Sequence, residues 1–304
     1  MLSICIPIYN SDVTELVASL LGQMDKVDGE TELLVIDDGS DIYNWNPGER
    51  TNKNFKYIYL DKNIGRASIR NYFLSKSKYS YLLFIDGDSS VISDYFLQNY
   101  LNELKSKELE VLCGGSIYQS EKPNKRFYLR WRYSTVRESK PVTIRNNDIH
   151  LGFKTNNFII KRSIFESIRF NENLTGYGHE DTLFGFELLK AQVPIRHIEN
   201  PVLNRSLDDN ETFLSKSEHA VKNLCQVLKL VKYDQLFIAS NRLCRTYFSL
   251  KKTRISWLIH FCLRLTHPLN YYLLSRGFFI LPMFDIFKLK NMMSNMDSGE
   301  SSLN

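Results

Sequence analysis

Two carboxylates separated by one glycine offer the clearest chemistry in this sequence. Asp86, Gly87 and Asp88 follow an apolar run that predicts a buried strand. Paired carboxylates at a strand end suit a hard divalent ion, Mn²⁺ or Mg²⁺, which keeps water and phosphate oxygens as its other ligands. An EF-hand calcium loop is excluded, because its sixth and twelfth positions fall on Val91 and Leu97. A solvated turn after a buried strand stays open as the alternative.

A second acidic pair repeats this pattern earlier in the chain. Asp37 and Asp38 follow an apolar run and precede Gly39 and Ser40. A carboxylate at a strand end can accept hydrogen bonds from a nucleobase or a ribose hydroxyl. Neither G-x-G-x-x-G nor G-x-x-x-x-G-K-[ST] occurs, which argues against NAD binding and P-loop chemistry. A bound diphosphate would therefore need a metal ion and basic side chains.

Basic side chains for that task stand at the start of a predicted helix, residues 65–77. Arg66 and Arg70 are one helical turn apart, and the positive end of the helix dipole also favours anions. The alternative is that both arginines are surface charges on an ordinary helix.

A third acidic pair opens another predicted helix, residues 180–191. Glu180 and Asp181 complement the helix dipole, which explains one acid without any function. Gly176 and Gly178 lie just before them and indicate a flexible or closely approached backbone. Such a loop could set a carboxylate beside a bound sugar as a general base.

The elements that must position these residues alternate between strand and helix, as in a parallel α/β sheet. Strands are predicted at 2–7, 32–36, 55–60 and 81–85, and helices at 12–24 and 65–77. Asp12 and Glu15 predict a capping box at the first helix. Ligands bind beyond the carboxyl ends of such strands, so we expect Tyr9, Asn10 and the first two acidic pairs to converge.

The later part of the chain continues with strands at 156–161 and 195–198 and a periodic helix at 213–232. We predict a catalytic domain over residues 1–232, with a nucleotide-sugar-binding half (1–115) and an acceptor half (116–232). A helical, basic and aromatic region follows at 233–304.

Composition narrows the protein class. The chain has 304 residues, 43% of them hydrophobic, and a net charge of +5, so a folded core is expected and a nucleic-acid partner is not. Five scattered cysteines without a C-x-x-C argue against a disulfide framework or a zinc cluster and favour the reducing cytoplasm. The first residues lack the basic segment of a signal peptide, which fits the same location.

The chain beyond residue 240 carries nine Lys or Arg against three Asp or Glu, a balance of +6. Its apolar stretches are too short for a membrane span but allow contact with the inner face of a membrane. Trp257, Leu258, Phe261, Leu265 and Leu269 have helical spacing. The alternative is that these five side chains pack on the catalytic domain.

Five motifs in this order make the chain resemble the family 2 glycosyltransferases, an inverting group with the GT-A fold. The resemblance covers about residues 1 to 200. The motifs are Ile4-Cys5-Ile6-Pro7-Ile8-Tyr9-Asn10, Val35-Ile36-Asp37-Asp38-Gly39-Ser40, Asn63-x-Gly65-x-Ala67-x-x-Arg70-Asn71, Phe84-Ile85-Asp86-Gly87-Asp88 and Gly176-x-Gly178-x-Glu180-Asp181. The fold class that the resemblance implies is a Rossmann-like, mostly parallel sheet flanked by helices.

The resemblance also implies roles for individual residues on the donor side. The residues that would bind the nucleotide sugar are Pro7, Tyr9, Asn10, Asp38, Arg70, Asp86 and Gly87. Among them Asp38 would contact the base, Arg70 would lie near base or diphosphate, and Asp86 would face the ribose or the donor sugar. Asp88 would coordinate the metal.

On the acceptor side, Asp181 matches the position of the base that acts on the acceptor hydroxyl, and Glu180 would support acceptor binding. Many relatives also place a metal-binding His at the end of the strand after the acidic helix, where this chain has Asn204. The metal is then bound either by Asp88 with water and phosphate, or by Asn204 as well. His197 lies inside the predicted strand and is interpreted as structural.

These features predict an inverting hexosyl- or N-acetylhexosaminyltransferase with a nucleoside-diphosphate-sugar donor, for which we expect a UDP-sugar. The expected acceptor is a saccharide or a lipid-linked molecule in bacterial-type surface glycan or polysaccharide synthesis. One alternative is a catalytically silent protein of the same fold that binds carbohydrate or a membrane surface. The other is a nucleotidyltransferase, which usually has a glycine- and lysine-rich loop after the first strand, where this chain has none.

Overall fold

The computed structural model describes residues 1–43, 45–48, 52–106, 109–147, 149–150, 152–278 and 281–301. Contacts within the chain divide it into two compact units. The first consists of Met1–Gln119, Arg137–Asn173 and Glu180–Ser206, and the second of Ser120–Val136, Leu174–His179 and Leu207–Asn304. The functional division that we predict, at residues 232 and 233, stays a prediction.

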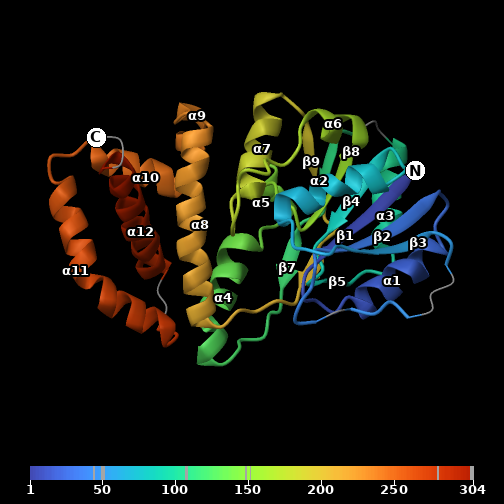
Figure 1. Cartoon of the computed structure of the whole chain (residues 1–304), viewed down its shortest axis with the longest axis horizontal. Helices are drawn as coiled ribbons and strands as arrows, with labels where there is room; N and C mark the ends of the chain where they lie inside the picture. Colours follow the sequence, from blue (N-terminus) through green and yellow to red (C-terminus); the bar gives the residue numbers. More distant parts are fainter. Residues whose placement is uncertain are drawn as a thin grey trace. The chain divides into compact units, whose positions relative to one another are not determined.

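The first unit is built on a seven-stranded sheet with the order β3-β2-β1-β4-β8-β6-β9 (Figure 1). Its strands are β1 (Leu2–Ile8), β2 (Thr31–Asp37), β3 (Phe55–Tyr59), β4 (Tyr81–Ile85), β6 (Val111–Cys113), β8 (Asn157–Lys161) and β9 (Ile195–His197). β8 is antiparallel to both of its neighbours, and the other described strands of this sheet run in one direction. The predicted α/β class with a mostly parallel sheet is confirmed.

Helices cover both faces of this sheet. α1 (Thr14–Met24) and α3 (Phe96–Ser106) pack on one face, and α2 (Arg66–Lys76), α6 (Arg162–Ser167) and α7 (Glu180–Lys190) pack on the other. A short helix, α5 (Val142–Arg145), lies in the segment before β8. Because both faces are covered, β2 is buried along its whole length, which explains its continuous apolar run.

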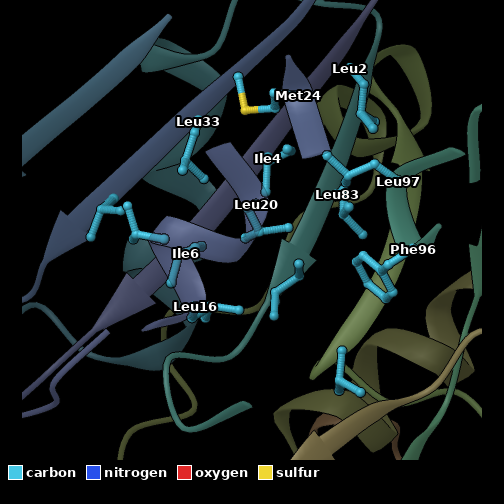
Figure 2. Close-up of a cluster of buried hydrophobic side chains, with 14 of the residues drawn as sticks. Leu2, Ile4, Ile6, Leu16, Leu20, Met24, Leu33, Leu83, Phe96 and Leu97 are labelled. Carbon is cyan, nitrogen blue, oxygen red and sulfur yellow. The ribbon is translucent and has the colours of Figure 1, made fainter. Parts of the chain in front are cut away.

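The core under α1 shows how the sequence pattern builds the packing. Leu16, Leu20 and Met24 are four residues apart and therefore share one face of α1 (Figure 2). They meet alternate residues of β1, Ile4 and Ile6, all of them buried. Each such side chain contributes about 1.5–3 kcal/mol to stability, so this face of the helix fixes its position on the sheet.

A second, smaller sheet has the order β5-β10-β7, from β5 (Ser89–Val91), β7 (Ser116–Tyr118) and β10 (Val202–Asn204). β10 pairs antiparallel with β5, which sets Asn204 opposite Ser89. The residue that follows Asp88 is therefore held beside the end of β10.

The strands and helices predicted for the first 200 residues are confirmed, with small differences at their ends. The capping box is wrong. α1 begins at Thr14, one residue later than a cap at Asp12 requires, and the Thr14 N–H donates to the Asp12 carboxylate at 2.9 Å. Glu15 forms an ion pair with Arg205 instead of reaching back to the helix start.

The second unit is helical, with α4 (Tyr128–Tyr133), α8 (Asn210–Leu230), α9 (Gln235–Ser240), α10 (Arg242–Lys251), α11 (Ser256–Ser275) and α12 (Leu281–Ser301). A 3-10 turn at Lys125–Phe127 precedes α4 and a π-helical turn at Ser134–Glu138 follows it. Phe213, Phe284 and Phe287 form its aromatic core. The buried Asn210 side chain donates to the carbonyls of Lys125 and Ser275, which ties three segments together.

α11 turns an apolar face outward. The five helically spaced residues predicted as a docking or packing face, Trp257, Leu258, Phe261, Leu265 and Leu269, are all exposed, by 43 to 72%. In this structure they are therefore not packing residues. Within the described residues, none of the helices combines the length and the apolar character that crossing a bilayer requires. All five cysteines are free in this structure.

Candidate active site

Asn10 joins the loop after β1 to the loop after β2. Its backbone has a left-handed conformation, with φ of 50°, and its N–H donates to the Ser40 hydroxyl at 2.7 Å. Its side-chain oxygen accepts from three consecutive N–H groups, those of Asp41, Ile42 and Tyr43, at 2.9 to 3.1 Å. The Tyr9 hydroxyl donates to the Asp41 carboxylate at 3.1 Å. Two predicted site residues thus shape one loop, and the Tyr9 ring is 45% exposed beside it.

The acidic pair after β2 is buried and hydrogen-bonded to protein. Asp37 accepts from the Ser40 N–H at 2.8 Å and from the Tyr57 hydroxyl at 3.1 Å. Asp38 accepts from the N–H groups of Ile64 and Gly65 at 2.7 and 3.1 Å. Burial raises the pKa of Asp38 although these two amides lower it. Asp38 therefore holds the loop that leads into α2.

Gly87 is a glycine because the ends of β1 and β4 approach each other. A Cβ at this position would lie 2.9 Å from a methyl group of Ile8 and 3.3 Å from the Pro7 carbonyl oxygen. Any larger residue would push the two strand ends apart. This packing accounts for the glycine between the two carboxylates, and it brings Pro7 into the group of strand-end residues.

Arg70 connects the end of β4 to the start of α7. Arg70 is 4% exposed, and its guanidinium donates to Asp86 at 2.8 Å and lies 3.9 Å from the Glu180 carboxylate. Arg66 approaches the same Glu180 oxygen at 3.4 Å from a side chain that is half exposed. Arg70 is therefore a buried residue that pairs with Asp86, and not a surface charge. Breaking such a buried ion pair is costly, so Arg70 holds the end of β4 in place.

Asp88 lines a cavity of about 320 Å³ together with Gly87, Ser89, Arg205 and residues of the loop after β1. The Asp88 carbonyl accepts from the Arg205 N–H at 2.9 Å, which keeps β10 beside it. The Asn204 side-chain oxygen accepts from the Ser206 N–H at 2.9 Å. Asp88 and Asn204 therefore lie at the same end of the small sheet.

The chemistry of this donor set fits one divalent ion of the Mg²⁺ or Mn²⁺ type. A carboxylate and an amide oxygen are hard ligands, and such ions take their remaining ligands from water and substrate phosphates. In the part of the chain that the structure describes, no three His, Cys, Asp or Glu side chains form a metal-binding group by themselves. A metal here would therefore depend on ligands from a bound diphosphate.

Asp181 stands at the start of α7, next to Glu180. Its carboxylate accepts from the Lys154 ammonium at 2.8 Å and from the Thr182 N–H at 2.7 Å. The Asp181 side chain is 18% exposed, so it lies at the surface of the site. Lys154 was not predicted from the sequence, although it stands just before the predicted strand 156–161.

The glycines before this acid pair have a packing role in the second unit. Gly178 has φ of 89°, and a Cβ there would lie 2.9 Å from the Ala220 side chain of α8. Its carbonyl accepts from the Asn223 side chain at 3.2 Å. Close approach to α8 explains Gly178, without the bound sugar that we expected as the reason.

His197 is structural, as predicted. It is 3% exposed, Arg145 donates to its Nδ1 at 3.1 Å, and its Nε2 donates to the Ile149 carbonyl at 2.8 Å in the tautomer that these contacts require. Burial lowers the pKa of His197, which favours the neutral ring.

The chain resembles one known protein family and several solved structures. The family model described as glycosyl transferase family 2 matches residues 3–169, which is more than half of the chain. No curated protein matches the sequence.

Among solved structures, S. aureus TarS 1-349 is 19% identical, with a TM-score of 0.51, and the match covers 99% of this chain and 91% of that one. The same fragment in complex with UDP gives a TM-score of 0.50 at 18% identity, over 99% and 91% of the two chains. The mannosyltransferase PcManGT from Pyrobaculum calidifontis, in complex with GDP-Man and Mn²⁺, is 11% identical, with a TM-score of 0.53 over 97% and 86%. The chain spans 42% of a longer TarS chain. At these identities the likeness shows the fold.

Proposed function

Because this chain belongs to glycosyl transferase family 2 and is an enzyme of the glycosyltransferase type, we propose that it moves a hexose or N-acetylhexosamine from a nucleoside-diphosphate sugar to an acceptor hydroxyl, with inversion. The observation that carries this proposal is the ion-pair network of Asp86, Arg70 and Glu180. Through Arg70, this network links Asp86 at the end of β4 to Glu180, the neighbour of the candidate base Asp181. The family match also sets aside the nucleotidyltransferase alternative.

The donor side is the edge formed by the ends of β1, β2 and β4. We place the nucleotide against the Tyr9 and Asn10 loop, with Pro7 and Gly87 as the packed floor. A carboxylate has about four lone-pair sites, and the two amides on Asp38 leave capacity for a contact with the base. Arg70 and Asp86 would lie near the diphosphate and the donor ribose or sugar. The TarS fragment solved with UDP supports a UDP-sugar as donor.

Asp88 and Asn204 would hold the divalent ion. The PcManGT complex, which contains Mn²⁺, supports this part of the proposal. When bound, such an ion neutralises negative charge that develops on the leaving diphosphate. The residues of this chain supply its ligands on one side only. The donor's phosphate oxygens would complete the site, which couples metal binding to donor binding.

The acceptor side centres on Asp181. The acceptor oxygen attacks the anomeric carbon while the bond from that carbon to the diphosphate oxygen breaks. The hydroxyl proton moves to the Asp181 carboxylate, and the nucleoside diphosphate leaves with the bonding electron pair. The Lys154 ammonium lies 2.8 Å from this carboxylate and holds it in place at the acceptor side. Glu180, held by two arginines, would orient the acceptor.

Release of free nucleoside diphosphate is the test. The protein is incubated with UDP- and GDP-sugars, with and without Mn²⁺, and with an acceptor panel of sugars and lipid-linked sugars. Metal-dependent release from one donor, with the product linkage inverted relative to the donor, is the expected result. Binding of nucleotide without any turnover over the whole panel would favour the catalytically silent alternative.

We further propose that the protein works in surface glycan or polysaccharide synthesis at the inner face of a membrane. The support is the outward face of α11, where Trp257, Phe261 and Leu265 are 61 to 72% exposed beside Arg264. Exposed apolar residues with neighbouring basic residues bind anionic lipid surfaces, at about 1 kcal/mol per basic residue.

Cosedimentation with vesicles tests this placement. The wild type should sediment with phosphatidylserine vesicles at low salt, and Leu265→Asp should stay in the supernatant. Leu236→Asp is the matched control, because Leu236 is also exposed, by 50%, on α9. A wild-type protein that never sediments with anionic vesicles would contradict the membrane role, and self-association lost in Leu265→Asp would assign the face to a second copy.

A further inference from the structure

A small cavity of about 60 Å³ adjoins the candidate base in the first unit. Its wall comes from the residues before β8, the turn after β6 and the segment around α5. These residues are Cys113, Gly115, Ser116, Arg137, Glu138, Lys140, Arg145, Gly152, Lys154, Asn156 and Asn157. The proposed function uses only Lys154 among them.

The cavity touches the candidate site at two points. On the acceptor side, the Lys154 ammonium lies 2.8 Å from the Asp181 carboxylate. On the donor side, the Asn156 carbonyl accepts from the Asp86 N–H at 3.2 Å. A group bound in the cavity would therefore lie next to the point of transfer.

The wall of the cavity is strongly cationic. Arg145 is structural, because its guanidinium donates to four backbone carbonyls, those of Lys140, Cys113, Gly114 and Ile198. Arg137, Lys140 and Lys154 also line the cavity, beside the carboxylate of Glu138, and the Lys154 ammonium is paired with Asp181. Lys140 is exposed and forms no ion pair with any other residue in the described ranges. Such a wall favours an anion.

A second feature of the cavity is a buried acceptor atom. The Asn156 side-chain oxygen is buried, and no described residue donates a hydrogen bond to it. Buried polar atoms are almost always hydrogen-bonded, so this oxygen needs a donor, from a bound water or from a ligand. A hydroxyl group would satisfy it.

Resting on the proposed glycosyl transfer, we infer that the acceptor carries a phosphate group close to its reactive hydroxyl, and that this cavity binds the phosphate. Arg137 and Lys140 contact its oxygens, Lys154 lies between the phosphate and Asp181, and Asn156 accepts from an acceptor hydroxyl. The small volume suits a phosphate group and not a sugar ring. The several acceptor oxygens of a phosphate match a wall that carries Arg137 and Lys140 better than a neutral sugar does.

The experiment measures binding by calorimetry to the full chain saturated with UDP and Mg²⁺. The probes are glycerol, glycerol 3-phosphate and glycerophosphoglycerol, which differ in having no phosphate, a monoester or a diester. Both phosphates should bind and glycerol should not. If glycerol 3-phosphate, the monoester, binds more tightly, the acceptor is a small phosphorylated molecule. If glycerophosphoglycerol, the diester, binds more tightly, the acceptor is a phosphodiester polymer.

Charge removal then locates the site. Lys140→Gln should weaken phosphate binding about 3- to 10-fold, because a partly screened charge-assisted hydrogen bond is lost. Arg137→Gln should act in the same direction, and UDP affinity should stay unchanged in both variants. Lys53→Gln is the matched control, an exposed lysine beside β3 at the opposite edge of the sheet from β6, and should bind like the wild type.

Three results would overturn the inference: no phosphate binding by the wild type, equal binding in Lys140→Gln, or a parallel loss of UDP affinity, which would assign the cations to the donor. The proposed glycosyl transfer fails separately, as absent turnover of every nucleotide sugar. If the enzyme transfers sugar to neutral acceptors and does not bind phosphate, the proposed phosphate site is wrong and the proposed glycosyl transfer still holds.

Discussion

Two acidic pairs follow two strands of the same sheet, β2 and β4, yet their surroundings differ. Asp37 and Asp38 are 0 and 4% exposed and accept hydrogen bonds from the protein's own amides and from a tyrosine hydroxyl. The Asp86 side chain is 30% exposed and paired with Arg70, and Asp88 lines a cavity of about 320 Å³. A buried carboxylate with backbone donors organises loops, whereas one that lines a cavity can gain a ligand. We therefore propose a mainly scaffolding role for the first pair and a chemical role for the second.

Asp88→Ala gives the largest effect that this comparison predicts. If Asp88 ligates the metal as proposed, its loss should remove the Mn²⁺-dependent part of UDP binding, measured by calorimetry, and should leave the free energy of unfolding nearly unchanged. Asp94→Ala is the control, since Asp94 is an exposed acid a few residues later. If Asp88→Ala keeps its metal-dependent affinity for UDP, Asp88 does not bind the metal and has a structural role like that of Asp38.

Asp181→Asn extends the comparison to the third acidic pair. If a partly exposed acid beside Lys154 is the base, turnover should fall at least about 10²-fold, and donor affinity should change little because the lost proton transfer acts on the acceptor. Steady-state kinetics and UDP calorimetry on the same preparation separate the two quantities. A collapse of donor binding would instead make Asp181 a structural residue of the donor side.

Asp38→Ala tests the scaffold side of the contrast. The variant leaves the N–H groups of Ile64 and Gly65 without their acceptor, which should lower the free energy of unfolding by about 1–3 kcal/mol in urea titrations. Asp61→Ala, at an exposed acid, is the control and should unfold like the wild type. Unchanged stability with lost UDP affinity would make Asp38 a ligand for the base alone.

The pH dependence of stability gives the smallest effect. Burial raises the pKa of Asp38 above its value in the unfolded chain, so the folded state binds this proton first as the pH falls. The contribution of Asp38 to stability is therefore complete below the unfolded pKa and is lost as the pH rises through the folded pKa. Relative to Asp38→Asn, the wild type should gain stability as the pH falls from neutral towards the unfolded-state pKa of about 3.9, by at most about 1.4 kcal/mol per pH unit. Parallel stability curves for the two proteins would mean that the Asp38 carboxylate is not buried in solution.

The sequence predicted well where the strands of the parallel sheet end and which acids stand at those ends, because an apolar run followed by polar residues marks the carboxyl end of a buried strand. Apolar runs followed by Asp38 or Asp86 identified the strands, and the strand order then brought Tyr9, Asn10 and these acids together. The packing roles of Gly87 and Gly178 could not be predicted in this way. Each depends on a residue from a distant segment, Ile8 in one case and Ala220 in the other.

Lys154 and Asn156 were missed because of the direction of one strand. β8 runs antiparallel to β4, with Asn157 opposite Ile85. Residues that precede β8 therefore lie at the edge where residues that follow β4 lie. The apolar pattern of a strand does not encode its direction, so the search for chemistry after strands passed over residues that stand before one.

The position of β8 also governs the order in which the protein can assemble during synthesis. β6 leaves the ribosome before β8, but it joins the sheet only through β8, by pairing of Val111 with Ile160. Val111–Cys113 must therefore wait unpaired until residue 161 has emerged, and Ser116–Tyr118 until their partner β10, Val202–Asn204, has emerged. Asp181 emerges later still, so a nascent chain that has already formed β1 to β4 has the proposed donor edge without the proposed base.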